Sequence, residues 1–77
     1  MDLAIEKELE AERASSLGRA GAALERALSD WRERPSHATQ KEAQLRLWYL
    51  VVQREALGIY RHREVYDVYA VPKRWWY

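Results

Sequence analysis

The sequence contains no cysteine, which excludes disulfides and thiolate metal sites. A chain of 77 residues has a thin core, because it buries only about 60% of the surface that its unfolded form exposes. Domains this small often depend on a disulfide, a metal or a second subunit. The lack of cysteine fits a reducing compartment, but many exported proteins also lack cysteine.

Long apolar runs are also absent. The longest uninterrupted run, Leu47 to Val52, has six residues, whereas a bilayer span takes about 20. This excludes a membrane-spanning helix. The starting stretch MDLAIEKELEAER is acidic and lacks the apolar segment of about 7–15 residues that a secretory signal requires. We therefore expect no export by that route.

An excess of charge of one sign is missing as well. The chain has 13 basic and 12 acidic residues and a formal net charge of +1. A protein that binds nucleic acid through its whole surface is usually far more basic. The charges are unevenly placed, since residues 2–12 are mostly acidic and the chain from Trp31 onward is basic.

The first half of the chain has no proline and is rich in Ala, Leu, Glu and Arg, which predicts one long helix over about 2–33. Asp2 is the expected N-cap. Apolar residues recur at seven-residue intervals and mark one face of this helix. They are Leu17, Leu24 and Trp31.

Glycines interrupt this helix and leave a second interpretation open, in which SSLG ends a first helix at Leu17. We favour a continuous helix, because the apolar period passes through the glycines without a phase shift. The small residues then form a groove where another helix approaches closely. The residues of this predicted helix-packing groove are Ala14, Gly18, Gly21 and Ala22.

Pro35 ends the first helix, since the residue before a proline disfavours helical dihedral angles. We predict a turn over 34–39 and a second helix over about 40–57. Thr39 and Glu42 fit a capping box at its start. Gly58 fits the left-handed residue that follows a helix.

The segment after Gly58 has two interpretations. Apolar residues share a helical face over about 63–70, but the β-branched and aromatic content also suits a strand. We predict a short helix, because a lone strand has no partner elsewhere in the chain. Pro72 ends it, and residues 71–77 form an aromatic tail.

The six-residue apolar run lies inside the second helix, and a helix that is apolar all round is buried all round. We therefore predict an all-α fold, a small bundle of a long first helix and a central second helix in an antiparallel hairpin. In this register Trp48 and Val52 lie across from about Glu25 and Gly21. The predicted core comprises Leu17, Gly21, Leu24, Trp31, Leu47, Trp48, Val51 and Val52.

The longer first helix leaves residues 3–15 without a partner. Because long polar helices rarely stand alone, we predict a homodimer, with a compact monomer capped by the tail as the alternative. Trp and Tyr beside Lys and Arg are typical of interaction hot spots, and also of core or membrane-interface residues. The predicted interface comprises Leu3, Ile5, Leu9, Trp75, Trp76 and Tyr77.

Residues for catalysis or metal binding are sparse. His62 lies near Glu55 and Glu64, but the Glu-x-x-His spacing of di-iron bundles is absent. His37 falls in the predicted turn. The serines lack the Gly-x-Ser-x-Gly context of a nucleophile. We expect no enzyme activity, no catalytic residue, no metal and no cofactor.

Basic residues alternate with aromatic ones in the second half of the chain, as in proteins that bind single-stranded nucleic acid. They are Arg46, Arg54, Arg61, Arg63, Lys73 and Arg74, with Tyr60, Tyr66, Tyr69, Trp75 and Trp76 between them. Glu55, Glu64 and Asp67 interrupt this patch, which disfavours nucleic acid as the partner.

The stretches ERASSLGRAGAALERAL and VVQREALGIYRHREVYDVYAVP resemble a type of small, uncharacterised bacterial protein. This resemblance implies a compact helical fold in a bacterial cytoplasm and carries no functional residues. We expect a module that acts by protein–protein association, first with itself and otherwise with an unidentified protein. The alternative is a nucleic-acid-binding regulator that uses the basic, tyrosine-rich half.

Overall fold

The computed structural model describes the backbone of residues 3–77 and the side chains of residues 16–77. The described chain contains helices and no strand, so the predicted all-α class is confirmed. The elements are α1 (Leu3–Glu33), α2 (His37–Ala56), α3 (Arg63–Val68) and a 3₁₀ turn, η1 (Lys73–Trp75). Asp2, the expected N-cap, lies outside the described residues.

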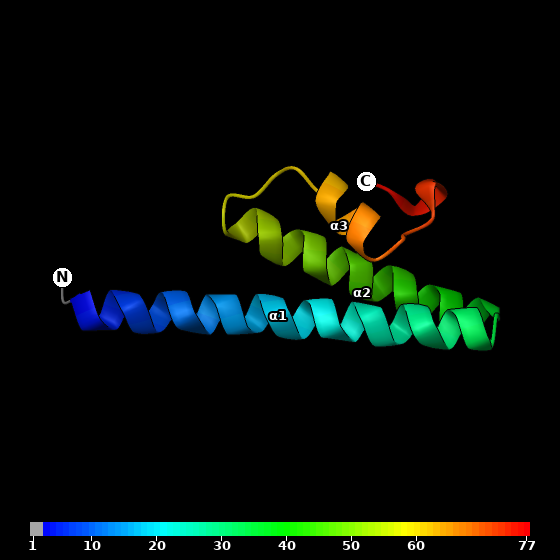
Figure 1. Ribbon diagram of the computed structural model, residues 1–77, viewed down its shortest axis with the longest axis horizontal. Coiled ribbons are helices and arrows are strands. Elements are labelled where there is room, and N and C mark those ends of the chain that lie inside the picture. The colour runs from blue at the N-terminus through cyan, green and yellow to red at the C-terminus, as the bar shows by residue number, and fades with distance from the viewer. Residues whose placement is uncertain (1–2) are drawn as a thin grey trace.

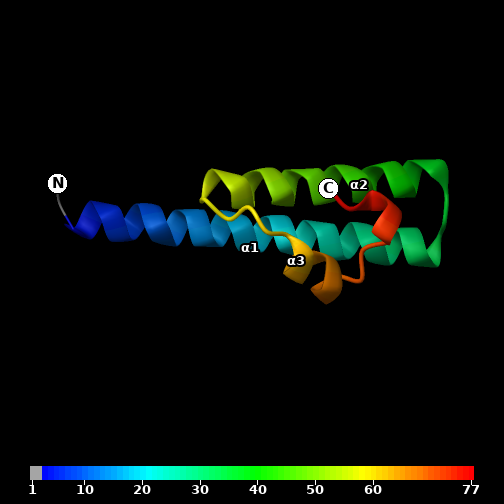
Figure 2. The same cartoon turned by 90° about the horizontal axis from the view of Figure 1, so that it is seen from above.

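The two long helices pack against each other, and α2 runs back beside the second half of α1 (Figure 1). The first half of α1 projects beyond the end of α2, which makes the molecule elongated, with extents of 49 × 20 × 17 Å. Figures 1 and 2 together place α3 and the tail on one face of this pair. The short elements therefore cover one side of α2 in addition to the side covered by α1.

α2 begins three residues earlier than the sequence predicted. Its N-cap is Ser36, whose Oγ accepts a hydrogen bond from the Thr39 N–H at 3.0 Å. In return, Thr39 Oγ1 accepts from the Ser36 N–H at 3.0 Å. The expected box of Thr39 and Glu42 is therefore wrong, because serine is at least as good a cap as threonine and stands first after the proline. Glu42 pairs with Arg46 instead, at 2.7 Å.

Two helices end in the same motif, in which a left-handed residue turns the chain back. After α2, Gly58 has a φ of 83°, and the Ile59 N–H donates to the Arg54 carbonyl at 3.0 Å. After α3, Ala70 takes the left-handed conformation with a φ of 53°. The Val71 N–H then donates to the Tyr66 carbonyl at 2.9 Å, which directs the tail onto the core.

The core lies where the second half of α1 meets α2, α3 and the tail. Its largest fully buried side chains, Leu24, Leu28 and Leu47, come from both long helices. Leu17 and Trp31 are partly buried at its edge. The remaining core residues are Ala27, Ala43, Leu50, Val51, Val65, Tyr66, Val71 and Trp75.

Ser16 of α1 lies near the end of α2, where it shares a hollow with Gln53, Ala56 and Leu57. Ser16 Oγ donates to Gln53 Oε1 at 3.0 Å. The predicted register, with Val52 across from Gly21, places residue 16 opposite about residue 57. Trp48 and Val52, predicted as core, are instead 46% and 41% exposed, because they lie on the side of α2 away from the buried Leu47 and Val51. α1 and the short elements cover two sides of α2 and leave the side that carries Trp48 and Val52 uncovered.

The aromatic tail folds onto the core. The ring centroids of Trp31 and Trp75 lie 4.7 Å apart. Trp76 stacks on Tyr66 at 4.8 Å, and its Nε1 donates to the Val71 carbonyl at 2.9 Å. These contacts order the tail as part of the domain.

The groove predicted around the glycines receives a tyrosine rather than a side chain of α2. A Cβ at Gly21 would lie 2.5 Å from Tyr69 Oη, whereas a Cβ at Gly18 would meet nothing within 4 Å. Arg32 holds this tyrosine's segment in place, because its Nη2 donates to the carbonyls of Tyr69 and Ala70 at 3.0 Å each. Gly21 therefore has a packing role that Gly18 lacks.

This difference predicts opposite effects of enlarging the two glycines. Gly21→Leu is expected to lower the free energy of unfolding by about 1–3 kcal/mol, because the new side chain displaces Tyr69. Gly18→Ala, the control in the same helix, is expected to raise it by up to about 1 kcal/mol through helix propensity. Urea unfolding followed by circular dichroism measures both. A neutral Gly21→Leu would contradict the packing of Tyr69 on α1.

Candidate functional site

Four large apolar side chains lie exposed together on α2. Leu45, Trp48, Tyr49 and Val52 are each between 41% and 46% exposed. Their spacing of three, four and seven residues places them on one helical face. This face is opposite the buried one, which consists of Ala43, Leu47, Leu50 and Val51. We call the four exposed residues the α2 stripe.

Polar side chains border the α2 stripe. The Trp48 and Tyr49 rings contact each other, with centroids 5.3 Å apart. Arg46 lies over the Tyr49 ring at 6.0 Å and also pairs with Glu42. An apolar centre with a polar rim is the usual composition of a protein–protein interface.

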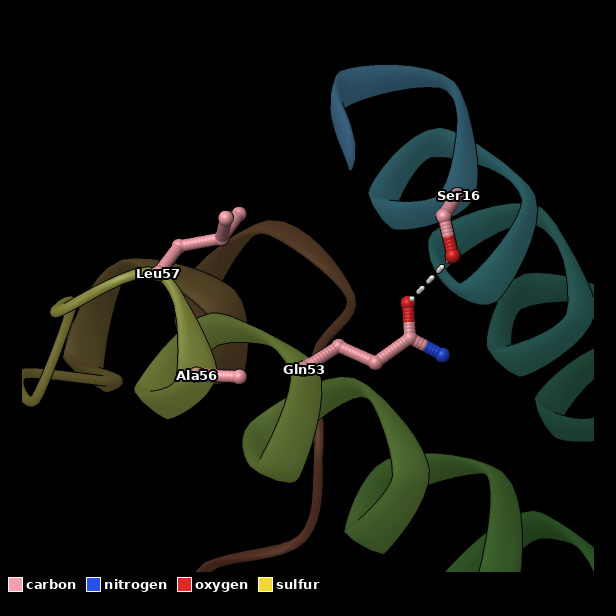
Figure 3. Close-up of a pocket in the computed structure, with 4 residues that line it drawn as sticks. All are labelled: Ser16, Gln53, Ala56 and Leu57. Atoms are coloured by element: carbon pink, nitrogen blue, oxygen red, sulfur yellow. Dashed lines mark hydrogen bonds between the residues drawn. The ribbon is translucent and has the colours of Figure 1, made fainter. Parts of the chain in front are cut away.

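Shallow hollows follow the seam between α1 and α2. One of about 250 Å³ is lined by Ser16, Gln53, Ala56 and Leu57, and the Ser16–Gln53 hydrogen bond crosses it (Figure 3). The next, of about 350 Å³, reaches Arg19, Arg46 and Tyr49. In this seam the Ser16 hydroxyl faces an amide oxygen, which cannot act as a general base, so the hollows offer no arrangement for nucleophilic catalysis.

His62 is buried, only 7% exposed, and both of its ring nitrogens face protein groups. Arg54 Nε donates to Nδ1 at 3.3 Å, so the proton lies on Nε2, which contacts Glu55 Oε1 at 3.2 Å. Arg54 also donates to the Arg61 carbonyl at 2.9 Å. This cluster attaches the segment after Gly58 to the end of α2. Among the described residues, no three His, Cys, Asp or Glu side chains gather as metal ligands.

The basic residues of the alternative nucleic-acid hypothesis are largely engaged within the chain. Arg63 pairs with Asp67 at 3.2 Å and lies 4.9 Å from the Trp76 ring. Arg74 lies 5.8 Å from the ring of Trp75. Arg54 and Arg46 have the partners given above.

The residues of the predicted interface fall into three groups. Trp75 is 6% exposed and belongs to the core, and Trp76 is half-buried against Tyr66. Tyr77 is exposed, although its N–H donates to Tyr66 Oη at 3.0 Å. Partial desolvation, and then the neighbouring Tyr66, raise the pKa of the Tyr77 phenol above its ordinary value. The side chains of Leu3, Ile5 and Leu9 lie outside the described residues.

The predicted helix-packing groove is also brought together only in part. Gly21 is buried beneath Tyr69, and Ala22 is half-buried beside it. Gly18 is exposed, and the side chain of Ala14 lies outside the described residues. The small residues therefore accommodate the Tyr69 ring at Gly21, and no second helix packs along the described part of the groove.

Sequence reasoning missed the α2 stripe because it assigned Trp48 and Val52 to the core and gave no role to Leu45 and Tyr49. The signal was present, since these residues repeat at helical spacing on the side opposite Leu47 and Val51. A helix with two apolar faces requires two covers, and the described chain supplies cover for only one of them.

Comparisons with known proteins identify a family without assigning an activity. No helix in the described part of the chain is long and apolar enough to cross a membrane. No curated protein matches the chain, and no solved structure does. The model of a family of unknown function, DUF6665, matches residues 2–75, which is nearly the whole chain. The chain therefore belongs to this family of unknown function, DUF6665.

Proposed function

We propose that this chain acts by protein–protein association, first with a second copy of itself, through the α2 stripe. The observation that supports this most directly is the joint exposure of Leu45, Trp48, Tyr49 and Val52 opposite the core. Single exposed apolar residues are common, but a contiguous exposed group rimmed by polar residues is typical of an interaction site. Tyr and Trp are also enriched among the residues that dominate binding energy.

The small size of the domain supports a second copy as the partner. Domains of this length often complete their cores by association. The chain has no cysteine and therefore no disulfide to compensate for a thin core. Covering the α2 stripe in a dimer would remove a Trp and a Tyr from water, each worth more than an aliphatic side chain in buried area.

The experiment is solution mass by light scattering over a dilution series, for the wild-type chain and for Val52→Glu. We expect the wild-type mass to rise to that of a dimer and to change little between low and high salt, because the contact is apolar. Val52→Glu is expected to remain a monomer, and at low concentration it should unfold at the same temperature as the monomeric wild type, since Val52 is outside the core.

Val68→Glu is the matched control. Val68 lies on α3, is 69% exposed, and receives the same substitution away from the α2 stripe. This variant should dimerise like the wild type. A wild-type chain that stays monomeric at the highest concentration would overturn the proposal, and so would equal loss of dimer in both variants.

A further inference from the structure

The α2 stripe continues at both ends into charged residues at regular spacing. Lys41, Leu45, Trp48, Val52 and Glu55 follow one another at intervals of four, three, four and three residues. This alternation keeps side chains along one line of a helix and is the spacing of a helix-pairing seam. All five are exposed in the structure, and the Glu55 side chain is 47% exposed.

The two ends of the seam carry opposite charges. Its positive end, Lys41, and its negative end, Glu55, each lie seven residues from Trp48. A two-fold axis through Trp48, perpendicular to the helix, therefore brings Lys41 of one copy level with Glu55 of the other. Leu45 then lies within about 1.5 Å, along the helix axis, of Val52 in the other copy, because one residue rises by that amount.

We propose that two copies of this chain associate with their α2 helices antiparallel, related by a two-fold axis at Trp48. This inference rests on the proposed function and deepens it by naming the orientation of the partner. Trp48 meets its own symmetry mate, and Leu45 packs against Val52. The Lys41–Glu55 pair occurs twice, as the symmetry of such an interface requires.

Charge complementarity selects this arrangement over a parallel pair. In a parallel dimer Lys41 faces Lys41 and Glu55 faces Glu55, and like charges across an interface oppose association. In Figure 2, α3 lies over α1 and the end of the tail overlaps α2, and the four side chains of the α2 stripe remain exposed beside these segments. The same polarity explains why the partner is a second copy: the seam is complementary to itself when reversed.

Charge reversal tests the orientation through the homodimers, because a parallel wild-type dimer already brings like charges together and neither single variant would weaken it. Lys41→Glu alone and Glu55→Lys alone each place like charges at both symmetric contacts, so each homodimer should weaken by about tenfold or more. An equimolar mixture should form a heterodimer of near wild-type affinity, because every contact is again between opposite charges. Native mass spectrometry of the mixture is expected to show heterodimer well above the statistical half.

Two further variants separate charge from folding. Glu55→Gln keeps an oxygen that can accept from His62 Nε2, so it is the control for the loss of the Glu55–His62 contact. Lys41→Cys adds a single thiol to a chain that has none. In the antiparallel dimer the two thiols are about 14 residues of rise, roughly 21 Å, apart and form no disulfide when a mild oxidant such as oxidised glutathione is added. In a parallel dimer the same oxidant accepts the two electrons and the thiols are cross-linked.

The possible results separate a failure of the antiparallel orientation from a failure of the proposed function. A statistical mixture of the charge variants, or a disulfide-linked dimer of Lys41→Cys, would overturn the antiparallel pair. If Val52→Glu abolishes the dimer while either of these results is found, association through the α2 stripe stands and only the orientation fails. A wild-type monomer at every concentration would overturn both, and binding of a different protein at the stripe would then replace the second copy.

Discussion

Replacing Trp75 by alanine is expected to lower the free energy of unfolding by about 3–5 kcal/mol. Trp75 is 6% exposed, and its ring lies 4.7 Å from that of Trp31, so the change leaves a large cavity between the tail and α1. A domain of this size rarely has more than about 3–5 kcal/mol of stability from its core. Far-UV circular dichroism should therefore show a mostly unfolded variant at 37 °C.

Conservative changes at the tail provide the control. The Trp75 indole N–H makes no hydrogen bond with the described residues, so Trp75→Phe loses volume without losing a polar contact. It should be clearly more stable than Trp75→Ala. If Trp75→Ala has the same urea midpoint as the wild type, the tail is detached from the core in solution. The tryptophan would then be free for a partner, which is the alternative that the sequence left open.

Much of the helical framework follows from local signals. Pro35 limits α1, and the uninterrupted apolar period through Gly18 and Gly21 fits the single helix observed over Leu3–Glu33. Gly58 takes a positive φ where α2 ends. These features depend on residues close together in the chain, so propensity and capping rules reach them.

The contacts between the helices could not be predicted from local signals alone. A cap at Ser36 instead of Thr39 lengthens α2 at its start, and Trp48 and Val52 lie exposed instead of in the core. Periodicity marks an apolar face but cannot say which of two opposite faces packs against α1. The partner of Gly21 was equally out of reach, since Tyr69 arrives from a turn after α3.

The assignment of faces on α2 can be tested with two neighbouring residues. Leu47 is 1% exposed and Trp48 is 46% exposed, so the structure places the first in the core and the second on the surface. Leu47→Ala is expected to lower the free energy of unfolding by about 2–5 kcal/mol, because it opens a cavity between α1 and α2. Trp48→Ala should cost less than about 1 kcal/mol in the monomer, although it removes the larger side chain.

The two variants are compared by urea unfolding at a protein concentration low enough that the wild type is monomeric, because association adds apparent stability to the folded state. At high concentration Trp48→Ala should lose the concentration-dependent part of the stability that the wild type gains. Leu47→Ala should keep that dependence wherever it still folds. If both variants lose the same free energy of unfolding at low concentration, Trp48 belongs to the core. The helix α2 would then be covered on all sides and have no free face for a partner.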